Sequence, residues 1–157
     1  MAQEIERKFL VVDSSWRHEA TRKLYRQGYI PTQNKTTVRV RIAGDRGYLT
    51  VKGASTGITR LEFEYEIPSA DAGNMLNSLC IPPLIEKWRY QLTVGNHLWE
   101  IDEFLGENAG LVLAEVELAS EIESFVLPAW VGEEVSHDPR YYNANLARFP
   151  YRSWQTS

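Results

Sequence analysis

Alternation between apolar and polar side chains dominates the chain up to residue 119, in short segments divided by Gly, Pro, Asn and Asp. A period of two residues is typical of antiparallel strands, and the dividing residues favour turns. The pattern predicts eight strands, over residues 4–12, 24–30, 37–42, 47–52, 58–67, 85–94, 97–104 and 111–119. The sequence therefore indicates a β-rich, α+β fold whose strands meet in antiparallel hairpins.

Helical signals are few. A helix is predicted to begin at Ser69 and to end before Pro82, with apolar residues at helical spacing. A second is predicted over 120–127, where Glu123 completes a capping box. A short third helix is predicted after the turn at 138–140. Helices therefore supplement a fold that is made mainly of strands.

The polar faces of the predicted strands carry charges at i and i+2, positions that share one face of a strand. These sets are Glu4, Glu6 and Lys8; Arg39 and Arg41; Arg60, Glu62, Glu64 and Glu66; Lys87 and Arg89; Glu100 and Asp102; and Glu115 and Glu117. On any one strand, a polar face is ordinarily the side that meets water. Neighbouring like charges repel, however, unless partners offset them, so their recurrence favours a bound ligand. Bases of this kind suit phosphates, carboxylates suit a divalent metal, and an eight-stranded closed sheet could gather both in its lumen.

Overall charge and composition narrow the classes of function. The 157 residues carry 17 Lys and Arg against 21 Asp and Glu, a net charge of −4, which disfavours a nucleic-acid polymer as partner. No apolar run is long enough to span a membrane, and the first residues lack the apolar core of a secretory signal. We therefore expect a single cytoplasmic domain over residues 1–157, with no membrane partner. Cys80, the only cysteine, is expected to be a small buried residue.

The ordered set of charged pairs resembles the CYTH domain, also called the triphosphate tunnel metalloenzyme superfamily. Residues 4–8, Glu-Ile-Glu-Arg-Lys, have the form of its ExExK signature. The matching motifs then continue in order with Arg39-x-Arg41, Lys52, Glu62-x-Glu64, Lys87-x-Arg89, Glu100-x-Asp102 and Glu115-x-Glu117. The tail that begins at Trp130 is similar to that of compact bacterial members. This resemblance implies an eight-stranded antiparallel closed barrel, or tunnel, with a few short helices outside it.

Members of that family hydrolyse or cyclise triphosphate substrates with Mg²⁺ or Mn²⁺, so the resemblance implies roles for the matching residues. The phosphate-binding bases would be Lys8, Arg39, Arg41, Lys52, Lys87 and Arg89. The metal ligands, direct or through water, would be drawn from Glu4, Glu6, Glu62, Glu64, Asp102, Glu115 and Glu117. Arg7, on the opposite face of its strand, is expected to pair with an acid outside the tunnel.

The resemblance also implies a catalytic pair. Compact bacterial members combine the signature lysine with a tyrosine of the next strand to orient water, and Lys8 and Tyr29 occupy those positions. A lysine among other cations can have its pKa lowered enough to accept a proton. The simpler alternatives are electrostatic binding for Lys8 and a packed strand aromatic for Tyr29.

Hydrolysis of a small triphosphate, with inorganic triphosphate favoured, is the function that these residues predict. An adenylate cyclase that makes cyclic AMP from ATP, and a nucleoside or thiamine triphosphatase, are alternatives within the same fold. A non-catalytic polyphosphate-binding module is a third possibility, although this many carboxylates would weaken anion binding unless a metal intervened. By analogy, the protein could form a homodimer.

Overall fold

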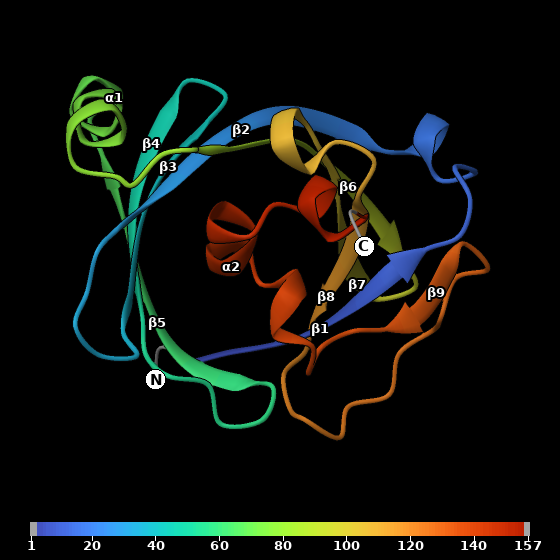
Figure 1. Ribbon diagram of the computed structural model, residues 1–157. Helices are drawn as coiled ribbons and strands as arrows, with labels where there is room; N and C mark the ends of the chain where they lie inside the picture. Colours follow the sequence, from blue (N-terminus) through green and yellow to red (C-terminus); the bar gives the residue numbers. More distant parts are fainter. Residues whose placement is uncertain (1–2, 156–157) are drawn as a thin grey trace.

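The computed structural model describes residues 3–155, and its centre is a closed antiparallel barrel (Figure 1). The strands of these residues are β1 (Gln3–Val11), β2 (Thr21–Ile30), β3 (Thr37–Ala43), β4 (Arg46–Lys52), β5 (Thr59–Ile67), β6 (Ile85–Val94), β7 (His97–Phe104), β8 (Val112–Glu117) and β9 (Val131–Glu134). The neighbours follow the order β5-β4-β3-β2-β6-β7-β8-β1, and pairing of β5 with β1 closes the barrel. The predicted eight-stranded barrel is thereby confirmed.

Strand β1 holds the barrel together because it pairs with three other strands. Its first residues lie beside β5, with Glu4 opposite Arg60, and its middle lies beside β8, with Lys8 opposite Glu115. Its last residues pair with β9, which the sequence pattern did not predict. β2 also begins earlier than the predicted residue 24, at Thr21. The charged residues of β1 therefore lie between β5 and β8, the strands on either side of it in the barrel.

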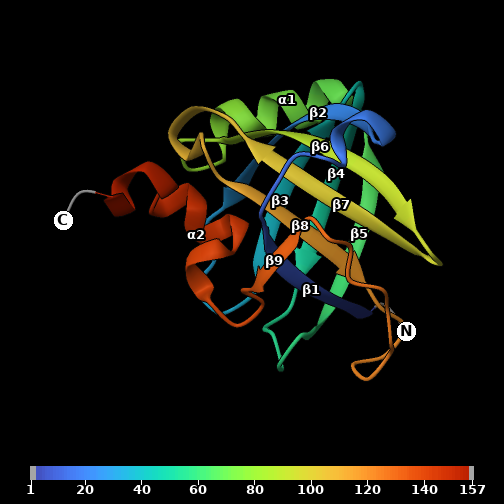
Figure 2. The same ribbon diagram turned by 90° about the vertical axis from the view of Figure 1, so that its right-hand side faces the viewer.

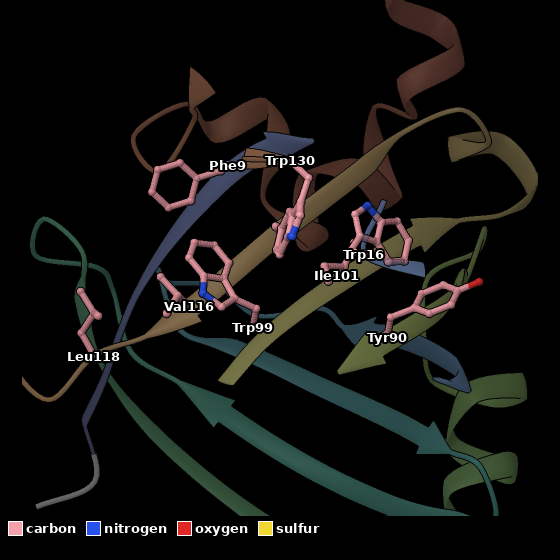
Figure 3. Close-up of a cluster of buried hydrophobic side chains, with 9 residues drawn as sticks. Phe9, Trp16, Tyr90, Trp99, Ile101, Val116, Leu118 and Trp130 are labelled. Atoms are coloured by element: carbon pink, nitrogen blue, oxygen red, sulfur yellow. The ribbon is translucent and has the colours of Figure 1, made fainter. Parts of the chain in front are cut away.

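Much of the hydrophobic core lies outside the barrel wall rather than within it. Phe9, Trp99, Val116 and Trp130 belong to one buried cluster, and the Trp99 and Trp130 ring centroids are 5.4 Å apart (Figure 3). Because neighbouring residues on a strand point to opposite faces, packing these side chains outward turns the charged faces into the lumen. This inside-out arrangement follows directly from the alternating pattern of the sequence.

The helices cover different parts of the barrel. α1 (Ser69–Ser78) packs on the outside of β3 and β4, where Ala72 and Leu76 are buried. α2 (Asn143–Arg148) lies at one end of the barrel and contacts β2 and β6 (Figures 1 and 2). The 3₁₀ turns are η1 (Arg17–Glu19), η2 (Gly106–Asn108), η3 (Pro139–Tyr141) and η4 (Tyr151–Gln155). None of the helices within residues 3–155 is long and apolar enough to cross a membrane.

The helix predicted over 120–127 is wrong, since the structure has a turn followed by irregular chain there. The Glu123 contacts there differ from those of a capping box: its carboxylate accepts a hydrogen bond from the Ala119 amide, and its amide donates to the Ser120 carbonyl rather than to the Ser120 hydroxyl. The chain then leaves the helical path because Phe125 packs against Trp99. Tertiary packing therefore overrides a local helix signal.

Candidate active site

A cavity of about 1060 Å³ occupies the barrel and is walled by the inward-facing side chains of the strands. The predicted site residues that line it are Glu4, Glu6, Lys8, Tyr29, Arg39, Arg41, Lys52, Glu62, Glu64, Lys87, Arg89, Glu115 and Glu117. The remaining predicted residue, Asp102, is 2% exposed, is not part of the cavity lining and contacts two lining residues, Arg89 and Lys87. Arg7 points outward and pairs with Glu134, as the sequence predicts. The alternation of side chains along the strands thus brings into one cavity residues that are more than 100 positions apart, such as Glu4 and Glu115.

Arg39 and Arg41 of β3 share one carboxylate, that of Glu64 on β5, across the intervening strand β4. Each places Nη2 close to Glu64 Oε2, at 3.2 and 3.3 Å, and Thr50 donates a further hydrogen bond of 2.8 Å to the same oxygen. Burial opposes ionisation of Glu64, but Arg41 and Thr50 outweigh it and lower the pKa of the carboxyl. The Nε atoms of both arginines are buried without a hydrogen-bond partner among the described residues. These two donors remain available to an oxygen-rich ligand.

Lys52 occupies a similar position between two acids. Its Nζ lies 2.9 Å from Glu4 Oε2 and 3.3 Å from Glu62 Oε2. Glu4 is buried, whereas the Glu62 side chain is 28% exposed. A phosphate that approached Lys52 would therefore compete with two carboxylates already in place.

Asp102 forms ion pairs with two bases, Arg89 and Lys87. Its oxygens accept hydrogen bonds of 2.7 and 2.8 Å from Nε and Nη2 of Arg89, and Lys87 Nζ lies 2.8 Å from Oδ2. Burial raises the pKa of Asp102, but the charges of Arg89 and Lys87 outweigh this and hold it below its usual range. The sequence-based role of Asp102 as a metal ligand is thus less consistent with the structure than a role in positioning these two bases.

Lys87 is the lysine with the most strongly altered acidity. Its side chain is 1% exposed, and burial lowers its pKa from the ordinary 10.5 to about 7, against the opposing attraction of Asp102. Its Nζ also donates a 3.0 Å hydrogen bond to Asn143 Oδ1 at the start of α2. Near neutral pH, a substantial fraction of Lys87 can therefore carry a lone pair on Nζ.

Four glutamates, Glu4, Glu6, Glu115 and Glu117, form the acidic part of the lumen across β1 and β8. Burial, followed by the neighbouring Glu115 and Glu4, raises the pKa of Glu6 well above its usual range. Burial also opposes ionisation of Glu115, yet the charges of Lys8 and Arg89 outweigh it and keep that pKa low. Burial and nearby carboxylates raise the pKa of Glu117. Such repulsion is relieved by a cation.

A divalent metal suits this set of oxygen donors. Within residues 3–155, no three acidic, His or Cys side chains converge closely enough to enclose an ion by themselves. Mg²⁺ usually takes one or two carboxylates and completes its octahedral shell with water and substrate phosphates. The acidic part of the lumen fits that requirement, since its carboxylates could supply part of the shell of such an ion.

Lys8 and Tyr29, the predicted catalytic pair, hydrogen-bond to different partners. Lys8 Nζ donates to the Tyr141 carbonyl at 3.0 Å and lies 3.5 Å from Glu115. The Tyr29 hydroxyl accepts a 2.9 Å hydrogen bond from Gln27 Nε2, and burial raises its pKa. Their catalytic pairing stays a prediction.

Sequence reasoning missed the contribution of the C-terminal segment. Asn143 contacts Lys87 and, at 3.4 Å, Gln27, while the carbonyl of Tyr141 holds Lys8. Backbone carbonyls and isolated amides carry no motif, so no pattern could identify them. Arg60 also lines the cavity, and its parity with Glu62 was the available signal.

A closed antiparallel barrel with carboxylates and bases in its lumen is the tunnel fold that the sequence predicts. The chain belongs to the CYTH domain family, which matches residues 2–147. It is 52% identical to the inorganic triphosphatase of Acetivibrio thermocellus over 155 residues, 99% of each chain. It is 37% identical over 148 residues to that of Nitrosomonas europaea, covering 92% of this chain and 96% of the relative. A solved inorganic triphosphatase structure superposes with a TM-score of 0.68 at 34% identity, covering 94% of this chain and 95% of the other.

Proposed function

We propose that this protein is a metal-dependent inorganic triphosphatase, which hydrolyses triphosphate to diphosphate and phosphate inside the barrel. The observation that carries the proposal is the charge of the cavity. Nine Lys and Arg and seven Glu line it, although the chain as a whole carries −4. A lumen of this kind suits a small polyanion accompanied by metal, and the two relatives described above are named inorganic triphosphatases.

The bases bind and orient the substrate. Arg39 and Arg41 offer forked donors to phosphate oxygens, while Lys8 and Lys52 add compact charges. Arg89 adds positive charge, since its Nε and Nη2 are hydrogen-bonded to Asp102. We assign the proton-accepting role that the sequence predicts for Lys8 to Lys87 instead, because the pKa of Lys87 is lowered to about 7. A neutral Lys87 accepts a proton at Nζ from the attacking water, and Tyr29 orients that water through its hydroxyl. Asp102 keeps Arg89 and Lys87 in place. Together these groups position the reactants and supply charge where phosphoryl transfer requires it.

The metal-binding residues that we propose are Glu4, Glu6, Glu115 and Glu117, with Mg²⁺ or Mn²⁺ as the ion. When bound, the ion would neutralise charge on the triphosphate and lower the barrier to its hydrolysis. Glu62 and Glu64 stay predicted ligands; their carboxylates contact Lys52 and the Arg39–Arg41 pair, just as Glu4 contacts Lys52. A cytoplasmic location and a homodimer remain further predictions from the sequence.

Phosphate release from inorganic triphosphate, ATP and thiamine triphosphate, each with Mg²⁺ or Mn²⁺ and with a chelator, tests this function. We expect inorganic triphosphate to be hydrolysed with the highest kcat/KM and the chelator to abolish turnover. Equal or faster turnover of a nucleotide would refute the choice of substrate. Formation of cyclic AMP from ATP would assign the protein to the cyclases instead.

A further inference from the structure

Three of the nine bases in the cavity have no acidic partner. Lys8, Arg39, Arg41, Lys52, Lys87 and Arg89 each place a nitrogen within 4.0 Å of a carboxylate. Lys35, Arg60 and Arg148 do not do so with any residue in the described range 3–155. Their charges are therefore not neutralised by neighbouring acids within the protein.

These three bases lie at the same end of the barrel. β2 and β4 are each antiparallel to β3, so the loops that follow them, 31–36 and 53–58, open on one end. Lys35 belongs to the first loop, and Arg60 donates to the Gly53 carbonyl at 3.2 Å, beside the second. Arg148 ends α2, whose Asn143 contacts Lys87 near the beginning of β6 at this same end. Figure 2 shows α2 at the left-hand end of the barrel.

The opposite end has a different charge. There the cavity is lined by Asn96, His97 and Leu98 of the β6–β7 hairpin, which reaches the right-hand end in Figure 2. Glu100, 29% exposed, and the exposed Glu117 lie towards this end, and His97 contacts Glu123. Since Lys35 and Arg148 are exposed and also line the cavity, the cavity meets water at the basic end as well.

We propose that Lys35, Arg60 and Arg148 form an anion-capture site through which the polyphosphate substrate enters the barrel. This inference rests on the proposed function and adds to it the end of the barrel through which the substrate enters. A cleft lined by charges of one sign attracts an oppositely charged substrate and raises its rate of association. The unpaired bases can receive a phosphate without competition from a carboxylate, whereas each of the six paired bases deeper in the lumen already contacts one. The substrate then passes from unpaired bases to paired ones.

The first test removes the capture charges. The double variant Lys35→Gln/Arg148→Gln should lower kcat/KM for inorganic triphosphate about three- to tenfold at low salt, with kcat unchanged. The difference should shrink at high salt, because exposed charges are screened. The matched control, Arg26→Gln/Arg46→Gln, removes the same charge from ion pairs with Glu86 and Glu66 outside the cavity, and should keep the wild-type kcat/KM. Equal losses in both double variants would overturn the proposal.

The second test blocks each end of the barrel in turn. Lys35→Cys and Asn96→Cys provide thiols at opposite ends for coupling to a polyethylene glycol maleimide, while the native Cys80 is buried and serves as the unlabelled background in treated wild type. Coupling at position 35 should slow turnover of triphosphate, and coupling at position 96 should leave it unchanged. The reverse order would refute this direction of approach.

Failure of the proposed function would give a different result. If the wild type did not hydrolyse inorganic triphosphate, its binding could still be measured by calorimetry. The Lys35→Gln/Arg148→Gln variant should then bind triphosphate more weakly than the Arg26→Gln/Arg46→Gln control at low salt. Equal affinities would overturn the capture site independently of catalysis.

Discussion

Asp102→Asn separates a structural role for this carboxylate from the metal-binding role that the sequence predicts. The substitution keeps the size of the side chain and one oxygen acceptor but removes its charge. In the folded protein it leaves Arg89 and Lys87 buried without their closest acidic partner, since Asp102 contacts them at 2.7–2.8 Å. The expected consequence is a loss of stability with little change in metal affinity.

The expected loss of folding free energy follows from the burial of the Asp102 ion pairs. Removing one partner of a buried ion pair costs about 3–5 kcal/mol, and the remaining oxygen acceptor favours the lower limit. For a chain of this size, about 3 kcal/mol corresponds to a decrease in Tm of roughly 6–12 °C. The pKa of Asp102 is lower in the folded protein than usual, so its contribution is present at pH 7 and is lost as the pH falls through that folded value. The difference between variant and wild type should therefore shrink in acid.

Thermal and urea unfolding of the metal-free protein measure the loss, and Mg²⁺ titration by calorimetry measures binding. Glu103→Gln is a matched control on the same strand, because Glu103 forms a partly exposed ion pair with Arg17 on the outside. That variant should lose less than about 1 kcal/mol. If Asp102→Asn kept wild-type stability but lost most of its Mg²⁺ affinity, the metal-ligand assignment would be correct and the structural reasoning would be refuted.

Three further predictions concern catalysis. Turnover should rise as the pH increases through about 7, because Lys87 loses its proton there. Lys87→Arg should remove this pH-dependent rise in rate and lower kcat about 100-fold. An unchanged pH–rate profile in the variant would exclude Lys87 as the base. Glu115→Gln should lower turnover at least about 100-fold and weaken Mg²⁺ binding while leaving the circular dichroism spectrum intact, and wild-type rates would contradict its assignment. Tyr29→Phe should lower kcat about tenfold with KM unchanged, since only the water-orienting hydroxyl is lost; an equal change in KM would indicate substrate binding instead.

The barrel and most of its lining could be predicted because strand parity is a local property. Once Val38, Val40 and Ile42 face outward, Arg39 and Arg41 must face the lumen, whatever the distant strands do. The same rule orients Glu115 and Glu117 on β8. The sequence pattern therefore determined which side chains face inward, even though it missed β9 and the early start of β2.

The exposure and the pKa of each inward-facing residue could not be predicted in the same way. Glu100 and Asp102 lie on the same face of β7, yet Glu100 lines the cavity, whereas Asp102 is buried and its carboxylate is bound by Arg89 and Lys87. The low pKa of Lys87 results from its complete burial. One of the residues packed against its Nζ is Asn143, which begins α2 and is distant in the sequence. Parity gives direction, whereas exposure and acidity depend on tertiary packing.

The ion pairs of the lumen also explain why a metal should be required for tight substrate binding. Arg39 and Arg41 are held by Glu64, and Lys52 by Glu4 and Glu62, so a triphosphate that takes these bases leaves carboxylates facing its own negative charge. A divalent cation bound beside the substrate would offset both groups of oxygens at once. Triphosphate should accordingly bind much more weakly in a chelator than with Mg²⁺. The near balance of acids and bases in this protein is thus what the binding of an anion together with a cation in the lumen would require.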